Sequence, residues 1–173
     1  MGMVTKDFTV RVSDADESYG ESTPLGDVPR ILAERKAMAT PIYDGEAIIG
    51  CDTVVIYGGE LMGKPCDKAN AVRMLTKLSG TTHEVISGIC VRTSEKTYSC
   101  AVTTYVKFRP LSPLEIENYV NTYNPVDKAG AYGIQESAGA FVEKIDGDFY
   151  NVVGLPLCKL CQILNDEFQI SLL

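Results

Sequence analysis

The chain has 173 residues, of which 45% are hydrophobic and 23% are charged, and its formal net charge is −7. This length and composition are typical of one soluble domain with its own core, so residues 1–173 are expected to form a single domain. The acidic balance and the absence of a Lys/Arg-rich run argue against a protein that binds a nucleic-acid polymer. No apolar stretch has membrane-spanning length and no export signal is recognisable, which predicts a cytoplasmic protein without a membrane partner.

The first half of the chain alternates between strand and helix signals. Phe8–Val12 alternates in strand fashion and runs into an acidic stretch. Asp27 is a suitable cap for a helix with proline in its first turn. Ala47–Tyr57 is an apolar run typical of a buried strand, and the turn Gly58-Gly59 leads into a return strand over Glu60–Pro65.

The second half adds two predicted hairpins and three predicted helices. The hairpin strands are Val85–Arg92 with Tyr98–Phe108 and Gly139–Ile145 with Phe149–Val153. The helices run from Asp67 to Gly80, from the capping box Ser112–Glu115 to about Val120, and onward from near Pro156. Strands outnumber what a regular βαβ alternation needs. The sequence therefore predicts an α/β fold with a mixed twisted sheet flanked by helices.

Asp52 is the one charged residue in the apolar run Ala47–Tyr57. An unpaired carboxylate in a buried strand is unfavourable, so Asp52 is expected to meet a cation, a metal or a hydrogen-bond network. The alternative is a carboxylate satisfied by nearby backbone amides alone.

The cysteines and the single histidine give weaker signals. The chain has six cysteines, and its length and ordinary core composition favour reduced thiols. Cys158 and Cys161 form a C-x-x-C pair but lie well inside the predicted last helix, which disfavours metal or redox chemistry there. His83 is expected to anchor the start of a strand by hydrogen bonding. The segment Gly58–Pro65 resembles a phosphate-binding P-loop only in part, because Pro65 has neither a hydroxyl group nor an N–H.

Several polar residues beside strand ends and glycines form a candidate site with Asp52. They are Asp16 or Glu17, Lys36, Lys64, Lys128 and Gln135. Lysines facing carboxylates are the composition expected for a metal-bound polyphosphate, and an amide can read the edge of a base. Ordinary surface salt bridges would explain Glu17 and Lys36 equally well when each is taken alone.

At these positions the chain resembles the Maf-like nucleoside triphosphate pyrophosphatases, over nearly its whole length. The resemblance rests on the joint order of the segments Gly50–Val55, Gly63–Pro65, Leu78–Val85, Thr104–Pro110, Asp127–Gln135 and Val152–Pro156. It implies cleavage of a nucleoside triphosphate between its α and β phosphates, with Mg²⁺ or Mn²⁺ as cofactor. It also implies an elongated inosine-triphosphatase-like fold, commonly paired into homodimers.

The resemblance also implies roles for the acidic and basic residues. Asp52 matches the family's proton acceptor for the attacking water. Glu17 matches the acidic position before the first helix, and Lys36 and Lys64 match lysines that face phosphate. Metal ligation by Glu17 and Asp52 is a hypothesis.

Substrate choice follows from two further matches. Asp52-Thr53 and Ile134-Gln135 resemble the branch that acts on dTTP and UTP, with Thr53 and Gln135 setting base preference. Lys128 stands in the same glycine-rich segment as Gln135 and is expected to bind substrate. A glutamine amide can donate to a carbonyl and accept from the ring N–H of a uracil-like base.

The chain departs from the family in lacking the segment Ser-x-Ser-Pro-Arg-Arg, so an N-terminally truncated version of the fold is expected. The missing arginines would weaken transition-state stabilisation. The alternative function is therefore a catalytically impaired nucleotide-binding or interaction protein of the same family. A generic soluble domain without a nucleotide site is the remaining alternative.

Overall fold

The computed structural model describes residues 1–172, which form two compact units. The first unit contains residues 1–52, 87–102 and those from 154 onward, and the second contains residues 53–86 and 103–153. Three strands contribute residues to both units, and the prediction of a single domain stays a prediction.

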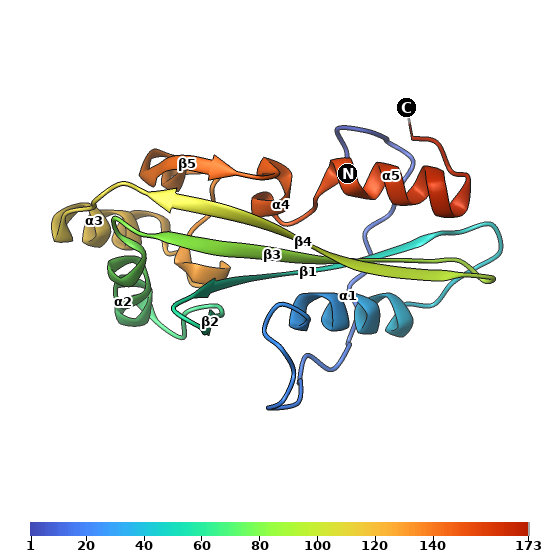
Figure 1. Cartoon of the computed structure of the whole chain (residues 1–173), viewed down its shortest axis with the longest axis horizontal. Helices are drawn as coiled ribbons and strands as arrows, with labels where there is room; N and C mark the ends of the chain where they lie inside the picture. The colour runs from blue at the N-terminus through green and yellow to red at the C-terminus, as the bar shows by residue number, and fades with distance from the viewer. Residues whose placement is uncertain (173) are drawn as a thin grey trace. The chain divides into compact units, whose positions relative to one another are not determined.

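Five strands form one sheet in the order β2-β1-β3-β4-β5. Their bounds are β1 Ile48–Tyr57, β2 Glu60–Met62, β3 Thr82–Arg92, β4 Thr97–Phe108 and β5 Val142–Asp146. Val55 pairs with Met62 across β1 and β2, and Tyr105 pairs with Asp146 across β4 and β5, both antiparallel. The arrows of β1, β3, β4 and β5 alternate in direction (Figure 1).

The helices complete the predicted α/β class, which is confirmed. They are α1 Val28–Ala39, α2 Lys68–Leu78, α3 Pro113–Tyr123, α4 Phe149–Val153 and α5 Leu157–Phe168, with 3₁₀ turns η1 Ala129–Ala131 and η2 Ser137–Phe141. A mixed sheet was expected, and the observed sheet is antiparallel. Hairpins join β1 to β2 and β3 to β4, which makes each of these pairs antiparallel. Among residues 1–172, no helix is both long and apolar enough to cross a bilayer.

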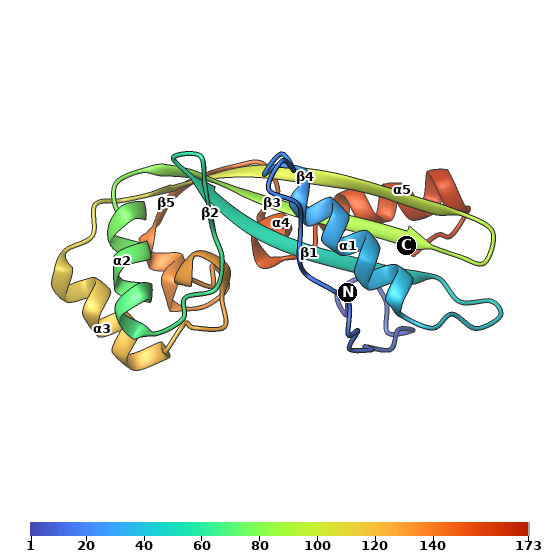
Figure 2. The same cartoon turned by 90° about the horizontal axis from the view of Figure 1, so that it is seen from below.

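In the first unit, α1 and α5 cover opposite faces of the strands (Figures 1 and 2). Alternation along β3 explains this, because Ile89 and Val91 pack in one cluster with the inner face of α5 while Cys90 packs with alanines of α1. A Cβ atom on Gly50 would lie 2.2 Å from the backbone oxygen of Ala33. This glycine therefore allows α1 to lie directly against β1.

The second unit is built around an aromatic core at the ends of β3 and β4. Phe108 is fully buried and packs edge-on against Tyr132 and Phe141, with ring centroids 4.9 and 6.0 Å away. The helices α2 and α3 pack together in the same unit and add Leu75, Leu78, Ile116 and Val120 to this core.

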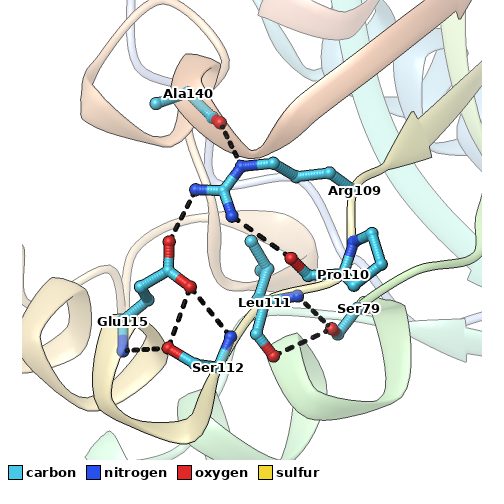
Figure 3. Close-up of polar contacts among 7 residues, drawn as sticks. All are labelled: Ser79, Arg109, Pro110, Leu111, Ser112, Glu115 and Ala140. Atoms are coloured by element: carbon cyan, nitrogen blue, oxygen red, sulfur yellow. Dashed lines mark hydrogen bonds and ion pairs between the residues drawn. The ribbon is translucent and has the colours of Figure 1, made fainter.

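Arg109 is the first residue after β4 and links this strand to η2 and α3 (Figure 3). Its guanidinium donates to Glu115 Oε1 at 2.7 Å and to the backbone oxygen of Ala140 at 3.0 Å. Glu115 also completes the predicted capping box with Ser112 at the start of α3, so that prediction is confirmed. The helix runs to Tyr123, one turn beyond the expected end.

Three predictions of local structure were wrong. Residues 8–12 form no strand, because the apolar side chains of this stretch, such as Val10 and Val12, stay exposed and contribute no burial. Phe149–Val153 is α4 and not the second strand of a hairpin. Cys158 is the second residue of α5 and therefore not well inside that helix.

The error at Phe149–Val153 has a clear physical reason. The turn signal Asp146-Gly147 suggested a hairpin with a strand after it, but Asn151 points inward and its amide donates to Val85 O at 2.9 Å and Thr104 Oγ1 at 3.0 Å. Asp148 Oδ1 accepts a hydrogen bond from the backbone N–H of Tyr150 at 2.7 Å. These contacts stabilise a helical turn that apolar patterning does not reveal.

Candidate active site

A lysine lies between two carboxylates in the first unit. Lys36 Nζ is 2.6 Å from Asp52 Oδ1 and 2.9 Å from Glu17 Oε1. The side chain of Asp52 is 14% exposed, whereas that of Glu17 is 62% exposed. The expectation that Asp52 meets a cation is thus confirmed, and a carboxylate satisfied by backbone amides alone is not what the structure has.

The charge environment of Lys36 favours the ammonium form. Burial acts to lower the pKa of Lys36, but the hydrogen bonds and charges of Asp52 and Glu17 outweigh burial, so the pKa is raised. Lys36 therefore stays protonated at neutral pH and keeps both carboxylates oriented toward one point.

Local structure explains why these three side chains meet. Lys36 is in the last turn of α1, and Asp52 follows Gly50 by two residues on β1, the strand that α1 covers. Glu17 comes from the irregular segment before α1. Neighbouring Asp16 instead accepts hydrogen bonds from the backbone and hydroxyl of Ser18. Of the two acidic candidates, Glu17 is thus the one that joins Lys36.

A glycine-rich loop in the second unit carries the other candidate residues. Gly130 donates its backbone N–H to Gly63 O at 3.1 Å, which brings the loop beside Lys64. Gly130 has φ +67°, and a Cβ there would lie 3.0 Å from Val55 Cγ2, so this position requires glycine.

Lys128, at the start of that loop, also lies between two carboxylates. Its Nζ is 2.9 Å from Asp127 Oδ2 and 3.4 Å from Glu136 Oε1. The hydrogen bond from Lys128 lowers the pKa of Asp127, and the charge of Lys64 acts in the same direction. The sequence did not predict Asp127 and Glu136 as partners of Lys128, although Asp127 begins the segment Asp127–Gln135 and Glu136 directly follows it.

The candidate residues thus fall into two sets. The first unit brings together Glu17, Lys36 and Asp52. The second unit contains Thr53, directly after Asp52 on β1, and Lys64, Lys128 and the exposed Gln135.

Residues 1–172 contain no cluster of three or more His, Cys, Asp or Glu side chains placed to hold a metal ion. Glu17 and Asp52 are two carboxylates directed toward one point, which Lys36 Nζ occupies. Two carboxylates with phosphate oxygens of a substrate are the kind of donor set that Mg²⁺ or Mn²⁺ prefers, and in this structure the ammonium of Lys36 stands at the point between them.

One further contact holds the strand beside Asp52. Cys51 donates its thiol to Gly154 O at 2.9 Å, and burial raises the pKa of this thiol to about 12. Cys51 therefore acts as a neutral hydrogen-bond donor within the first unit.

The structure is an α/β protein with a five-stranded antiparallel sheet, and a lysine lies between two carboxylates in it. These features are consistent with a Maf-like fold. The chain is a member of the Maf-like protein family, whose model matches residues 1–167.

Relatives from several bacteria support the assignment. A dTTP/UTP pyrophosphatase of Clostridium botulinum (strain 657 / Type Ba4) is 48% identical over 171 residues, covering 93% of this chain and 87% of the relative. The dTTP/UTP pyrophosphatase of Alkaliphilus metalliredigens (strain QYMF) is 46% identical over 170 residues, covering 96% and 88%. That of Symbiobacterium thermophilum is 43% identical over 158 residues, covering 91% and 81%.

Proposed function

We propose that this protein is a nucleoside triphosphate pyrophosphatase that hydrolyses dTTP and UTP to the monophosphate and pyrophosphate. The observation that carries the proposal is the contact of Lys36 with Asp52 and Glu17 in a chain of the Maf-like family. The names of relatives up to 48% identical support the choice of substrate.

In the proposed reaction, Asp52 accepts a proton from water and the resulting hydroxide attacks the α-phosphorus. The bond between that phosphorus and the oxygen bridging to the β-phosphate breaks, and pyrophosphate leaves with the bonding electrons. An ammonium 2.6 Å from Asp52 favours the ionised carboxylate, which is the form able to take the proton. When triphosphate binds, Lys36 is placed to share its positive charge with phosphate oxygens.

Mg²⁺ or Mn²⁺ is the proposed cofactor, with Glu17 and Asp52 as its protein ligands. When bound, the ion would neutralise charge on the phosphates. The chain's own contribution is to orient the two carboxylates, which the contacts of Lys36 support.

Substrate binding is assigned to the residues of the second unit. Lys64 and Lys128 are proposed to bind phosphate oxygens, while Thr53 and Gln135 are proposed to select a uracil-like base. The exposure of Gln135 on the loop that Gly130 joins to Gly63 supports its role, because an amide that reads a base must be accessible. A homodimer in the cytoplasm is proposed on the family resemblance.

Product analysis by ion-exchange chromatography tests the function. Purified protein is incubated with dTTP, UTP, CTP, ATP and 7-methyl-GTP in the presence of Mg²⁺ or Mn²⁺. We expect monophosphate and pyrophosphate from dTTP and UTP, and a loss of about 10²-fold or more for Asp52→Asn. Asp166→Asn, which removes an exposed carboxylate of α5, is the matched control and is expected to keep full activity.

Two outcomes would contradict this proposal. Release of inorganic phosphate instead of pyrophosphate would assign a different bond cleavage. Binding of UTP without turnover by a folded protein would instead support the catalytically impaired nucleotide-binding protein.

A further inference from the structure

His83 and Tyr132 form a buried hydrogen bond that the proposed chemistry does not use. His83 Nε2 lies 2.8 Å from the hydroxyl oxygen of Tyr132. The two residues are 2% and 6% exposed. His83 is the second residue of β3, whereas Tyr132 is in the loop between Lys128 and Glu136. The bond therefore ties that loop to the sheet.

The direction of this hydrogen bond follows from counting donors and acceptors. If the tyrosine donates to Nε2, the only group left without a partner is the Nδ1–H of His83. The reverse direction would leave both the tyrosine O–H and the bare Nδ1 unpaired, which is less favourable in a buried site. His83 Nδ1 has no hydrogen-bond partner among the described residues in either arrangement, so the direction follows from the tyrosine O–H, which is paired only in the first.

Burial reinforces that arrangement. It raises the pKa of Tyr132, so the hydroxyl keeps its proton. It lowers the pKa of His83 to about 4, so the ring is neutral at physiological pH and can accept.

His83 is itself held in place by aromatic neighbours. Its ring packs edge-on against Phe108 of β4, with centroids 5.0 Å apart at 88°, and against Tyr132 at 5.5 Å and 82°. Phe108 contacts Tyr132 at 4.9 Å. Three rings from β3, β4 and the loop thus support one another.

Two contacts fix the loop to neighbouring segments, an ion pair joins its two ends, and the side chains of Gln135 and Glu136 are exposed. Gly130 bonds to Gly63, Tyr132 bonds to His83, and Lys128 pairs with Glu136 across the loop. Ala131, next to Tyr132, has a left-handed backbone with φ +63°, a strained conformation for a residue other than glycine. Gln135 is exposed on this constrained segment.

We propose that His83, through Tyr132, is a positioning residue that holds the Lys128–Glu136 loop in the shape in which Gln135 reads the base of a pyrimidine nucleotide. This inference rests on the proposed function for its substrate. It goes further by assigning base discrimination to a buried pair that does not touch the nucleotide.

The test uses Tyr132→Phe, which removes one hydroxyl and keeps the ring packing. Hydrogen exchange is measured first, because it does not depend on activity. The amides of the Lys128–Glu136 loop are expected to exchange about 10-fold faster in this variant, while those of α3 are unchanged. Tyr105→Phe, which removes an exposed hydroxyl of β4, is the matched control and should leave exchange in the loop unchanged.

The second readout is base discrimination, the ratio of kcat/KM for UTP to that for CTP. Tyr132→Phe is expected to lower this ratio about 10-fold, mainly by raising KM for UTP, with kcat changed less than about 2-fold. His83→Gln, which can still accept from Tyr132, is expected to keep most of the discrimination. A purely structural role would instead lower kcat for both nucleotides together.

The outcomes separate this inference from the proposed function. Unchanged loop exchange in Tyr132→Phe, or faster exchange with an unchanged ratio, overturns the inference while leaving the pyrophosphatase intact. If the wild type releases no pyrophosphate, the proposed function fails. In that case base discrimination is measured by calorimetry, as the ratio of the Kd values of UTP and CTP, in place of the ratio of kcat/KM values. An unchanged Kd ratio in Tyr132→Phe overturns the inference.

Discussion

Lys36 Nζ lies 2.6 Å from Asp52 Oδ1, and the glycine two residues before Asp52 allows this contact. Gly50 brings the backbone of α1 against β1, so that a lysine in the last turn of the helix reaches a carboxylate of the strand. The candidate catalytic group is thus positioned by backbone packing as well as by its own charge.

A double-mutant cycle measures the coupling between these two residues. Lys36→Met leaves the largely buried carboxylate of Asp52 without its cation and is expected to lower the free energy of unfolding by about 1–3 kcal/mol. Adding Asp52→Asn removes that charge, so the double variant should be destabilised by less than the sum of the single variants, with a coupling of about 1 kcal/mol. Urea denaturation monitored by circular dichroism gives all four values. Additive losses would show that the contact contributes nothing to stability.

Substitution of Gly50 tests the backbone packing. In Gly50→Ala the added Cβ would overlap the backbone oxygen of Ala33, so α1 must move away from β1. We expect Gly50→Ala to lower the free energy of unfolding by about 1–3 kcal/mol. The folded fraction of this variant is expected to have a lower kcat, because Lys36 is displaced from Asp52. Gly20→Ala is the control, since its Cβ would meet only Thr23 Oγ1 at 3.6 Å and leave the protein unchanged. Wild-type stability in Gly50→Ala would contradict the close approach of helix and strand.

The site residues were easier to predict from the sequence than their partners. Asp52 stood out because charge is unfavourable in a buried strand, and the need for a cation followed from that alone. The residue pattern does not choose between Asp16 and Glu17, because the choice depends on the path of an irregular segment that no periodicity describes, and only the family resemblance favours Glu17. Glu136 was missed as a partner of Lys128 because their contact crosses a loop shaped by two positive φ angles, at Gly130 and Ala131.

The buried histidine should give the protein a distinct dependence of stability on pH. Burial lowers the pKa of His83 to about 4 in the folded state, from 6.5 when unperturbed. Well above pH 6.5, the His83 ring is neutral in both the folded and the unfolded protein. Between pH 6.5 and about 4, the ring is protonated in the unfolded chain but stays neutral in the folded one. The free energy of unfolding therefore falls as the pH drops toward 4. Across that window the loss attributable to His83 is about 3 kcal/mol.

Urea denaturation at several pH values measures this effect. From pH about 7 to about 5, the wild type is expected to lose about 2 kcal/mol more than His83→Gln, because the variant lacks the titrating ring. Parallel profiles for the two proteins would show that His83 titrates normally and is not held neutral by burial.

Glu115 should titrate far below an ordinary glutamate because of the contacts in Figure 3. The hydrogen bond from Arg109, followed by those from the backbone and hydroxyl of Ser112, lowers the pKa of Glu115 to about 2. A carboxyl group whose pKa is lowered by folding stabilises the protein at pH values above its unfolded-state pKa. This contribution is lost as the pH falls through the folded-state pKa. The carboxyl carbon followed by NMR should therefore show a midpoint near 2 in the wild type.

Removing the guanidinium identifies the main cause of that shift. Arg109→Met is expected to raise the pKa of Glu115 toward its usual 4.5, yet not fully, because both hydrogen bonds from Ser112 remain. Arg73→Met removes an exposed charge from α2 in the same unit and should leave the midpoint of Glu115 where it is. An equal rise in both variants would assign the shift to net charge, whereas a rise confined to Arg109→Met assigns it to the direct contact that joins the end of β4 to the start of α3.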